Sequence, residues 1–191
     1  MLIKTADIVI SQPEPEEETP DGLLTIQQDI TQGYIKYGLY SRRTIFFHAF
    51  YKAYDLESFK GNINNAKTLA DILSNLIKYF IPDPCLWTVI TTPQRAHTEK
   101  LGYHFASEVL RITARDTGIQ FLEEVIGAKN KNKIMPEFFQ LKPIPDTSKL
   151  ILFDDILTTG KTIYTTIDLL RNNPENNLKN NPLIIVGINN N

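Results

Sequence analysis

The stretch LILFDDILTTGKT, residues 150–162, joins an apolar run, two adjacent acids and a hydroxyl-rich turn that contains glycine. Its last letters, GKT, are typical of a Walker A loop, which also needs a glycine five residues before the glycine of the GK pair. That earlier position holds Asp155, whose carboxylate would repel a triphosphate. The Walker interpretation therefore fails, and Lys161 is not expected to grip a triphosphate.

The same stretch is consistent with a strand, a turn and a helix. Residues 149–153 (KLILF) form an uninterrupted apolar run, which is typical of a strand buried on both faces of a parallel sheet. We expect this strand to end at Phe153, so that Asp154 and Asp155 emerge at its carboxyl end. Open α/β sheets bind their ligands at that end of the strands.

The predicted turn has the properties of a site for one phosphate monoester. The unpaired amides and the dipole at a helix start attract an anion, and glycine allows close approach of the backbone. Two carboxylates beside such a site match the vicinal hydroxyls of a sugar, each of which can donate to an acid. The alternative is an ordinary strand–turn–helix with solvated acids. The predicted ligand is a ribose 5-phosphate, its hydroxyls bound by Asp154 and Asp155 and its phosphate by Thr158, Thr159, Gly160, Lys161 and Thr162.

The rest of the sequence predicts alternating strands and helices, and therefore an α/β fold with a mainly parallel central sheet flanked by helices. The clearest helix is residues 65–80, where apolar residues recur at helical spacing along one face. Tyrosines recur at positions 34, 37 and 40, a spacing that favours a helix face packed on the core over a base-stacking surface. The other expected helices are residues 103–116 and the segment after 162, and the expected strands are residues 2–10, 44–54, 86–90, 119–127, 149–153 and 183–188.

Length and composition indicate one globular domain over residues 1–191. Residues 11–22 carry five acids and three prolines without an apolar residue, and we expect an exposed loop or linker there. The single cysteine, Cys85, excludes an intramolecular disulfide, and neither a signal peptide nor a membrane span is recognisable, so a cytoplasmic location is expected. A net charge of −2 without clustered basic residues argues against direct nucleic-acid binding.

Residues 150–162 closely resemble the phosphoribosyl-pyrophosphate (PRPP) motif of type I phosphoribosyltransferases: four apolar residues, two acids, two further residues and T-T-G-x-T. Residues 91–106 (TTPQRAHTEKLGYHFA) are similar to the loop of the ComF-like branch that ends R-G-F-N-Q-A. Here the loop is one residue short, Leu101 stands at the usual arginine, and His104 replaces asparagine. The resemblance spans about residues 87–187. It implies a stand-alone phosphoribosyltransferase-like domain, because the zinc-binding cysteines that often precede this domain in the branch are absent.

The resemblance implies an enzyme that uses PRPP and Mg²⁺ to transfer ribose 5-phosphate to a nitrogenous base, releasing pyrophosphate. Mg²⁺ would be bound mainly through PRPP, so no residue is assigned as its ligand. Asp154 and Asp155 would contact the ribose, and residues 158–162 the 5′-phosphate. Arg95 would be the leading cation for the leaving group, with His97 as a weaker candidate. The implied pyrophosphate-binding residues are Thr91, Thr92, Pro93, Gln94, Arg95 and Lys100.

Some alternatives stay open. The chain is either an active transferase for an unknown acceptor or a non-catalytic PRPP-binding or sensing protein. A ComF-like accessory role in DNA handling is a further reading. Lys129, Lys131 and Lys133 form either a loop that closes over PRPP or a solvated connection. Homodimers are common in the family, so a homodimer is compatible with the resemblance.

Overall fold

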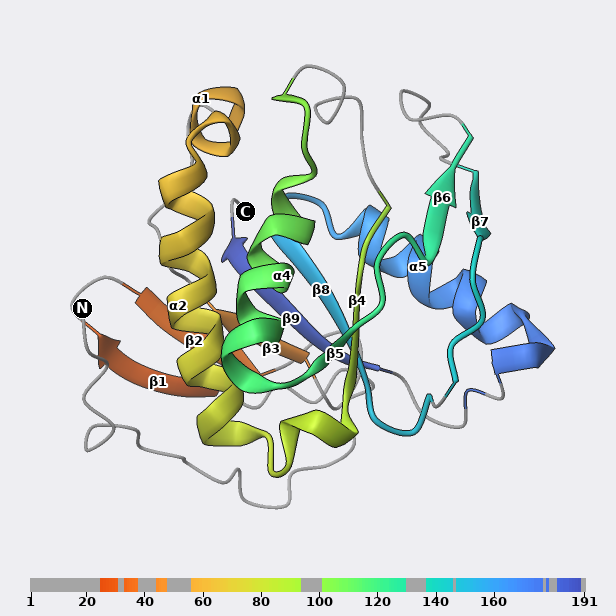
Figure 1. The fold of residues 1–191 in the computed structure, drawn as a ribbon, viewed down its shortest axis with the longest axis horizontal. Coiled ribbons are helices and arrows are strands. Elements are labelled where there is room, and N and C mark those ends of the chain that lie inside the picture. Colours follow the sequence, from red (N-terminus) through yellow and green to blue (C-terminus); the bar gives the residue numbers. More distant parts are fainter. Residues whose placement is uncertain are drawn as a thin grey trace.

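The computed structural model describes residues 25–30, 33–37, 44–47, 56–93, 101–129, 137–145, 147–176, 178 and 182–189. These residues form a seven-stranded sheet with flanking helices and a separate two-stranded sheet (Figure 1). The strands are β1 (Thr25–Ile30), β2 (Gly33–Tyr37), β3 (Thr44–Phe47), β4 (Thr88–Thr91), β5 (Gln120–Phe121), β6 (Ile126–Ala128), β7 (Phe138–Gln140), β8 (Leu150–Leu157) and β9 (Leu183–Asn189). The helices are α1 (Leu56–Gly61), α2 (Ile63–Phe80), η2 (Pro84–Leu86), α4 (Phe105–Thr117), α5 (Lys161–Asn172) and η3 (Pro174–Asn176).

The large sheet has the order β1-β2-β3-β9-β8-β4-β5. Its last five strands are parallel, whereas β1 and β2 pair antiparallel at one edge. Every residue of β8 is buried, as its apolar run requires of a central strand covered on both faces. The predicted α/β class with a mainly parallel sheet is confirmed.

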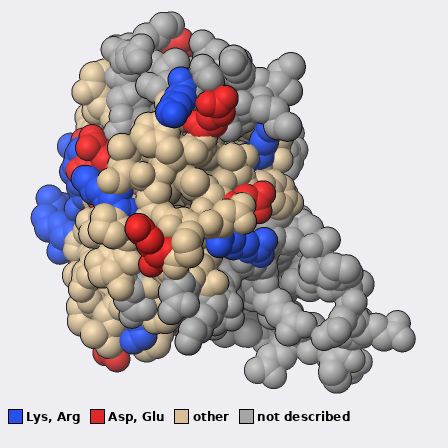
Figure 2. Space-filling model, turned by 90° about the vertical axis from the view of Figure 1, so that its right-hand side faces the viewer, with Lys and Arg blue, Asp and Glu red and all other residues tan. Residues whose placement is uncertain are grey.

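The described surface carries both signs of charge. On the face in Figure 2, Lys and Arg side chains lie among Asp and Glu side chains rather than in a block of one sign. Arg111, for example, is paired with both Glu108 and Glu123. Within the described ranges, the helices are too short or too polar to cross a membrane.

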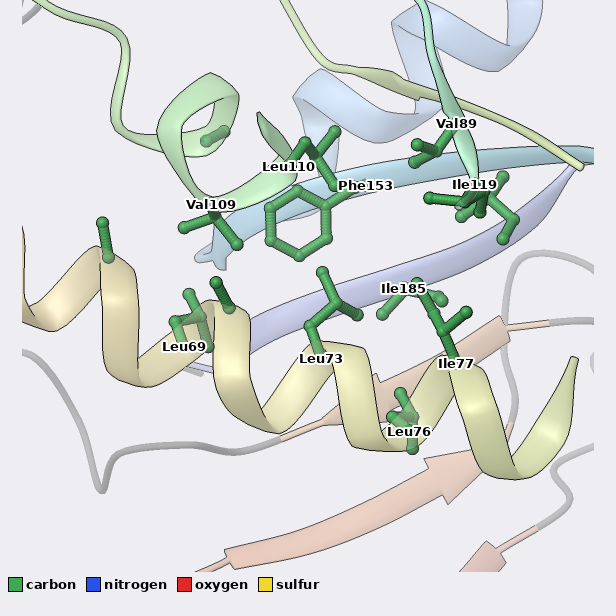
Figure 3. Close-up of a cluster of buried hydrophobic side chains, with 14 of the residues drawn as sticks. Leu69, Leu73, Leu76, Ile77, Val89, Val109, Leu110, Ile119, Phe153 and Ile185 are labelled. Atoms are coloured by element: carbon green, nitrogen blue, oxygen red, sulfur yellow. The ribbon is translucent and has the colours of Figure 1, made fainter. Parts of the chain in front are cut away.

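The larger apolar core lies between the sheet and the helices α2 and α4 (Figure 3). Asn62 caps α2 by accepting a hydrogen bond from the Asn64 amide, and the buried residues of α2 follow the predicted helical stripe. Leu73 of α2 and Phe153 of β8 are among the largest fully buried side chains. Truncating such a residue to alanine typically costs about 2–5 kcal/mol, so this core contributes strongly to the stability of the fold.

A second core covers the opposite face of the sheet, under α5. Ile163, Ile167 and Leu170 of α5 pack there with Leu150 and Leu152 of β8. Because side chains alternate along a strand, those of β8 are shared between the two cores. Ile151 and Phe153 belong to the core under α2 and α4. The sheet thus has α2 and α4 on one face and α5 on the other.

The connections reverse direction between β4 and β8. The chain runs from β4 through α4 outward to β5, and from β8 through α5 in the other direction to β9. β4 and β8 are neighbours, paired from Thr88 with Leu150 to Thr91 with Phe153. Their carboxyl ends form a topological switch point, the position at which open α/β sheets bind ligands.

Several predicted boundaries are wrong. β8 does not end at Phe153 but continues to Leu157, because Ile156 and Leu157 still pair with β9. Strand 86–90 begins only at Thr88, because a 3₁₀ turn starts at Pro84. The chain lies in a strand at positions 34 and 37, so the tyrosine spacing does not mark a helix there.

The single strand expected at residues 119–127 is two short strands that belong to different sheets. β5 pairs with β4, whereas β6 pairs with β7. Glu124 between them has a φ of 56°, a left-handed conformation that ends a strand. Of the strand expected at 44–54, residues 44–47 are confirmed. The rest of that segment, the strand at 2–10, the acidic loop at 11–22 and Tyr40 lie outside the described residues.

Candidate functional site

The switch point brings together the end of β4, the end of β8 and the start of α5. Thr92 follows β4 directly and is 4% exposed, and its amide donates to the carbonyl of Phe153 at 3.2 Å. Its hydroxyl donates to Oδ1 of Asp154 at 3.0 Å. Thr91 and Pro93 are buried beside it. Two of the predicted groups, the end of β4 and the first acid of β8, therefore meet in space.

Asp154 lies on the α5 side of the sheet. Its position alternates with Phe153 and matches Leu152, whose side chain packs under α5. The residue is 8% exposed, and Thr92 supplies one hydrogen bond to the carboxylate. A buried carboxylate at the carboxyl end of a central strand is suited to accept hydrogen bonds from a ligand hydroxyl.

Asp155 lies on the other side of the sheet. Its Oδ2 is 2.6 Å from Nζ of Lys60, the single lysine of the short helix α1. Burial alone would raise the pKa of Asp155, but the Lys60 ammonium and its hydrogen bond hold that pKa below its ordinary value. The carboxylate is therefore ionised and paired at neutral pH.

His104 lies at the start of α4, next to this ion pair. Its Nδ1 is 2.9 Å from Oγ of Ser107. Burial lowers the pKa of His104 to about 4, with Lys60 and Arg111 acting in the same direction and Asp155 and Glu123 opposing it. The imidazole is neutral at physiological pH and therefore adds no positive charge beside Lys60 and Asp155.

The predicted phosphate turn leads into α5. Gly160 is the N-cap of α5 with a φ of 71° and a ψ of −5°, so it is left-handed and has no side chain to occupy the helix start. The carbonyl of Gly160 accepts the first helical hydrogen bond, from the Tyr164 amide at 3.0 Å. Thr158 and Thr159 are exposed, whereas Thr162 is buried. The turn thus presents hydroxyls and a helix N-terminus at the same sheet edge as Asp154.

Several predicted residues lie outside the described residues, namely Gln94, Arg95, His97, Lys100, Lys131 and Lys133. Their roles stay predictions. Lys129 is described: its amide donates to the carbonyl of Glu137 at 2.9 Å, and its ammonium lies 5.8 Å from the ring centre of Phe139. Lys129 therefore directly follows β6, at the end of the β6–β7 pair from which the connecting segment continues.

Lys60 is the site residue that sequence reasoning missed. It belongs to a six-residue helix that was not predicted, and a lone lysine 95 positions before Asp155 gives no local signal of an ion pair. No group of three or more metal-binding side chains (His, Cys, Asp or Glu) occurs among the residues that the structure describes.

No protein-family model matches the sequence, and no curated protein does. Solved structures similar to the chain include phosphoribosyltransferases. Adenine phosphoribosyltransferase from Leishmania tarentolae has 15% identity and a TM-score of 0.42, with 71% of this chain and 76% of that chain covered. The enzyme from Giardia lamblia complexed with 9-deazaadenine has 16% identity and a TM-score of 0.44, with 72% and 86% covered.

Hypoxanthine-guanine phosphoribosyltransferase from Leishmania donovani has 12% identity and a TM-score of 0.40, with 70% of this chain and 67% of that chain covered. None of these structures singles out the ComF-like branch. The function of this chain is therefore inferred from its own residues.

Proposed function

We propose that the chain is a phosphoribosyltransferase that binds PRPP with Mg²⁺ and transfers its ribose 5-phosphate to a nitrogenous acceptor. The observation that carries the proposal is the placement of Asp154 and the Gly160 turn on one sheet edge, at the switch point between β4 and β8. A carboxylate and a helix N-terminus at that edge match the hydroxyls and the phosphate of one phosphorylated pentose.

Asp154 accepts a hydrogen bond from a ribose hydroxyl, while Thr92 keeps its carboxylate in place. Residues 158–162 hold the 5′-phosphate through backbone amides and threonine hydroxyls at the start of α5. The segment that follows Thr91 and Thr92 binds pyrophosphate, with Arg95 as its leading cation. The ribose thus lies over the end of β8, between the two phosphate-binding segments.

In phosphoribosyl transfer, the main contribution of the site is electrostatic stabilisation of the transition state. As the bond from C1 to the pyrophosphate oxygen breaks, positive charge develops on the ribose ring and negative charge on the leaving group. The carboxylate of Asp154 stabilises the ring charge, and the basic side chain of Arg95 stabilises the leaving group. Asp154 would offer a hard oxygen ligand of the kind that Mg²⁺ prefers, and Mg²⁺ would neutralise charge on pyrophosphate while taking most of its ligands from PRPP.

A second candidate function is PRPP binding without turnover. The observation that favours it is the pairing of Asp155 with Lys60, which commits one of the two expected ribose acids to a protein partner. A site with one available acid can still hold a ribose phosphate while stabilising the ring charge less. A regulatory protein needs only the binding step.

Two measurements on the same protein separate these functions. Calorimetric titration with PRPP and Mg²⁺ measures binding, and a pyrophosphate assay with a panel of purine and pyrimidine bases measures turnover. The transferase proposal expects binding and base-dependent release of pyrophosphate, both reduced in Asp154→Asn. Binding without release on any base would favour the sensor, and absence of PRPP binding would exclude both.

A further inference from the structure

Helix α1 is joined to the rest of the site by three contacts from a short segment. Lys60 pairs with Asp155 of β8 at 2.6 Å, and the hydroxyl of Tyr103 donates to the backbone carbonyl of Lys60. Phe59 stacks at a tilt against Phe105 of α4, with 5.4 Å between ring centres. Helix α1 therefore contacts both β8 and the segment 101–105.

These contacts place Lys60 between two parts of the site. On one side is the end of β8, which carries Asp154 and leads into the Gly160 turn. On the other is the segment 101–105, which begins where the predicted pyrophosphate loop ends. Lys60 contacts Asp155 of β8 directly, and the Lys60 side chain is 19% exposed. Its charge is therefore only partly screened by solvent.

The pair also determines which acid is available to a ligand. Consecutive residues of a strand point to opposite faces, so a pull on Asp155 toward α1 holds Asp154 toward α5. A carboxylate as buried as Asp155 is costly without its partner, since removal of one member leaves an uncompensated charge. Pairing with β9 sets the alternation of the two acids, and the ion pair with Lys60 holds the Asp155 carboxylate on the α1 side of the sheet.

We propose that Lys60 is a positioning residue for Asp154: its ion pair with Asp155 fixes the end of β8, so that Asp154 faces the ligand and Asp155 does not touch it. This inference rests on the proposed function. It replaces the ribose contact that the sequence predicted for Asp155 with a contact to the protein itself.

A double-mutant cycle of PRPP affinity tests the role of the pair. The variants are Lys60→Met, Asp155→Asn and the double variant, titrated with PRPP and Mg²⁺ at a temperature at which circular dichroism shows all of them folded. We expect each single change to weaken PRPP binding roughly tenfold and the double variant to bind no worse than either one, because contacting residues are not additive. Lys60→Arg, which keeps the charge, should restore most of the affinity.

The matched control is Lys67→Met, which removes an exposed lysine of α2 and should leave affinity unchanged. If Asp155 binds the ribose directly, Asp155→Asn will be far more harmful than Lys60→Met and the two effects will add, which overturns the inference. Unchanged affinity in Lys60→Met would overturn it as well. If the wild type does not bind PRPP, the proposed function fails and the positioning role fails with it, an outcome distinct from the other two.

Discussion

Thr92 and Asp154 are joined by a hydrogen bond of 3.0 Å although 62 positions separate them in the sequence. The bond links the ends of β4 and β8, the two strands that meet where the chain reverses its direction through the sheet. It therefore connects the segment expected to bind pyrophosphate with the acid expected to bind ribose.

Thr92→Val should destabilise the protein by about 1–3 kcal/mol, because a buried bond to a carboxylate is lost while the shape of the side chain is retained. Urea denaturation measures the change. Thr92→Ser keeps the hydroxyl and serves as the control. Equal free energies of unfolding for the valine and serine variants would contradict a contribution from this bond.

Asp154→Asn should weaken binding of PRPP with Mg²⁺ by about tenfold or more, since a charged acceptor is replaced by a neutral one. Isothermal titration calorimetry checks this. Asp168→Asn, which changes an exposed acid on α5, should bind like the wild type. Similar affinities for the two variants would show that Asp154 does not contact the ligand.

Stability should fall as the pH drops from about 6.5 toward 4, because His104 is neutral in the folded protein and its pKa of about 4 lies below that of the unfolded chain. The unfolded state binds the extra proton in this window, so the contribution is complete above pH 6.5. The loss should reach about 2–3 kcal/mol, reduced by the partial exposure of the ring.

Denaturation curves between pH 4.5 and 7.5 measure this slope, and His104→Gln should flatten it. The lowered pKa of Asp155 acts in a separate window, because its contribution is present above the ordinary aspartate pKa and is lost at more acidic pH. An unchanged slope in His104→Gln would show that other groups cause the dependence.

Gly160→Ala should weaken binding of ribose 5-phosphate and destabilise the protein by about 1–2 kcal/mol, because alanine is strained at a φ of 71°. Gly118→Ala is a matched control, since Gly118 has a φ of 77° at the other end of α4, away from the switch point. Both variants should lose similar stability, measured by thermal denaturation. Equal loss of ligand affinity in both variants would show that the Gly160 turn does not bind the phosphate.

The sequence was sufficient to predict the elements whose apolar pattern has one explanation. The stripe from Leu69 to Phe80 and the run at 183–188 predicted α2 and β9 closely. Boundaries failed where local chemistry is ambiguous. Asp154 and Asp155 resemble the end of a strand, but pairing with β9 holds the chain extended to Leu157. Glu123 and Glu124 gave no sign of the turn that separates β5 from β6.

The site was predictable only in its local part. Residues 150–162 carry their spacing in the sequence, so the strand, turn and helix could be predicted together. The opposite orientations of Asp154 and Asp155 follow from strand periodicity once the strand is known to continue. The partners Thr92 and Lys60 could not be assigned in advance, because their contacts depend on how distant elements pack.

Strand β9 has a consequence for the order in which this molecule assembles. It is inserted between β3 and β8 and pairs with both, although it comes after every other described strand in the sequence. During synthesis, β3 must therefore wait for residues 183–189 to leave the ribosome before it can join the parallel strands. Until then, β3 and β8 each expose an unpaired strand edge. A ribosome stalled just before this segment should therefore yield a product prone to association.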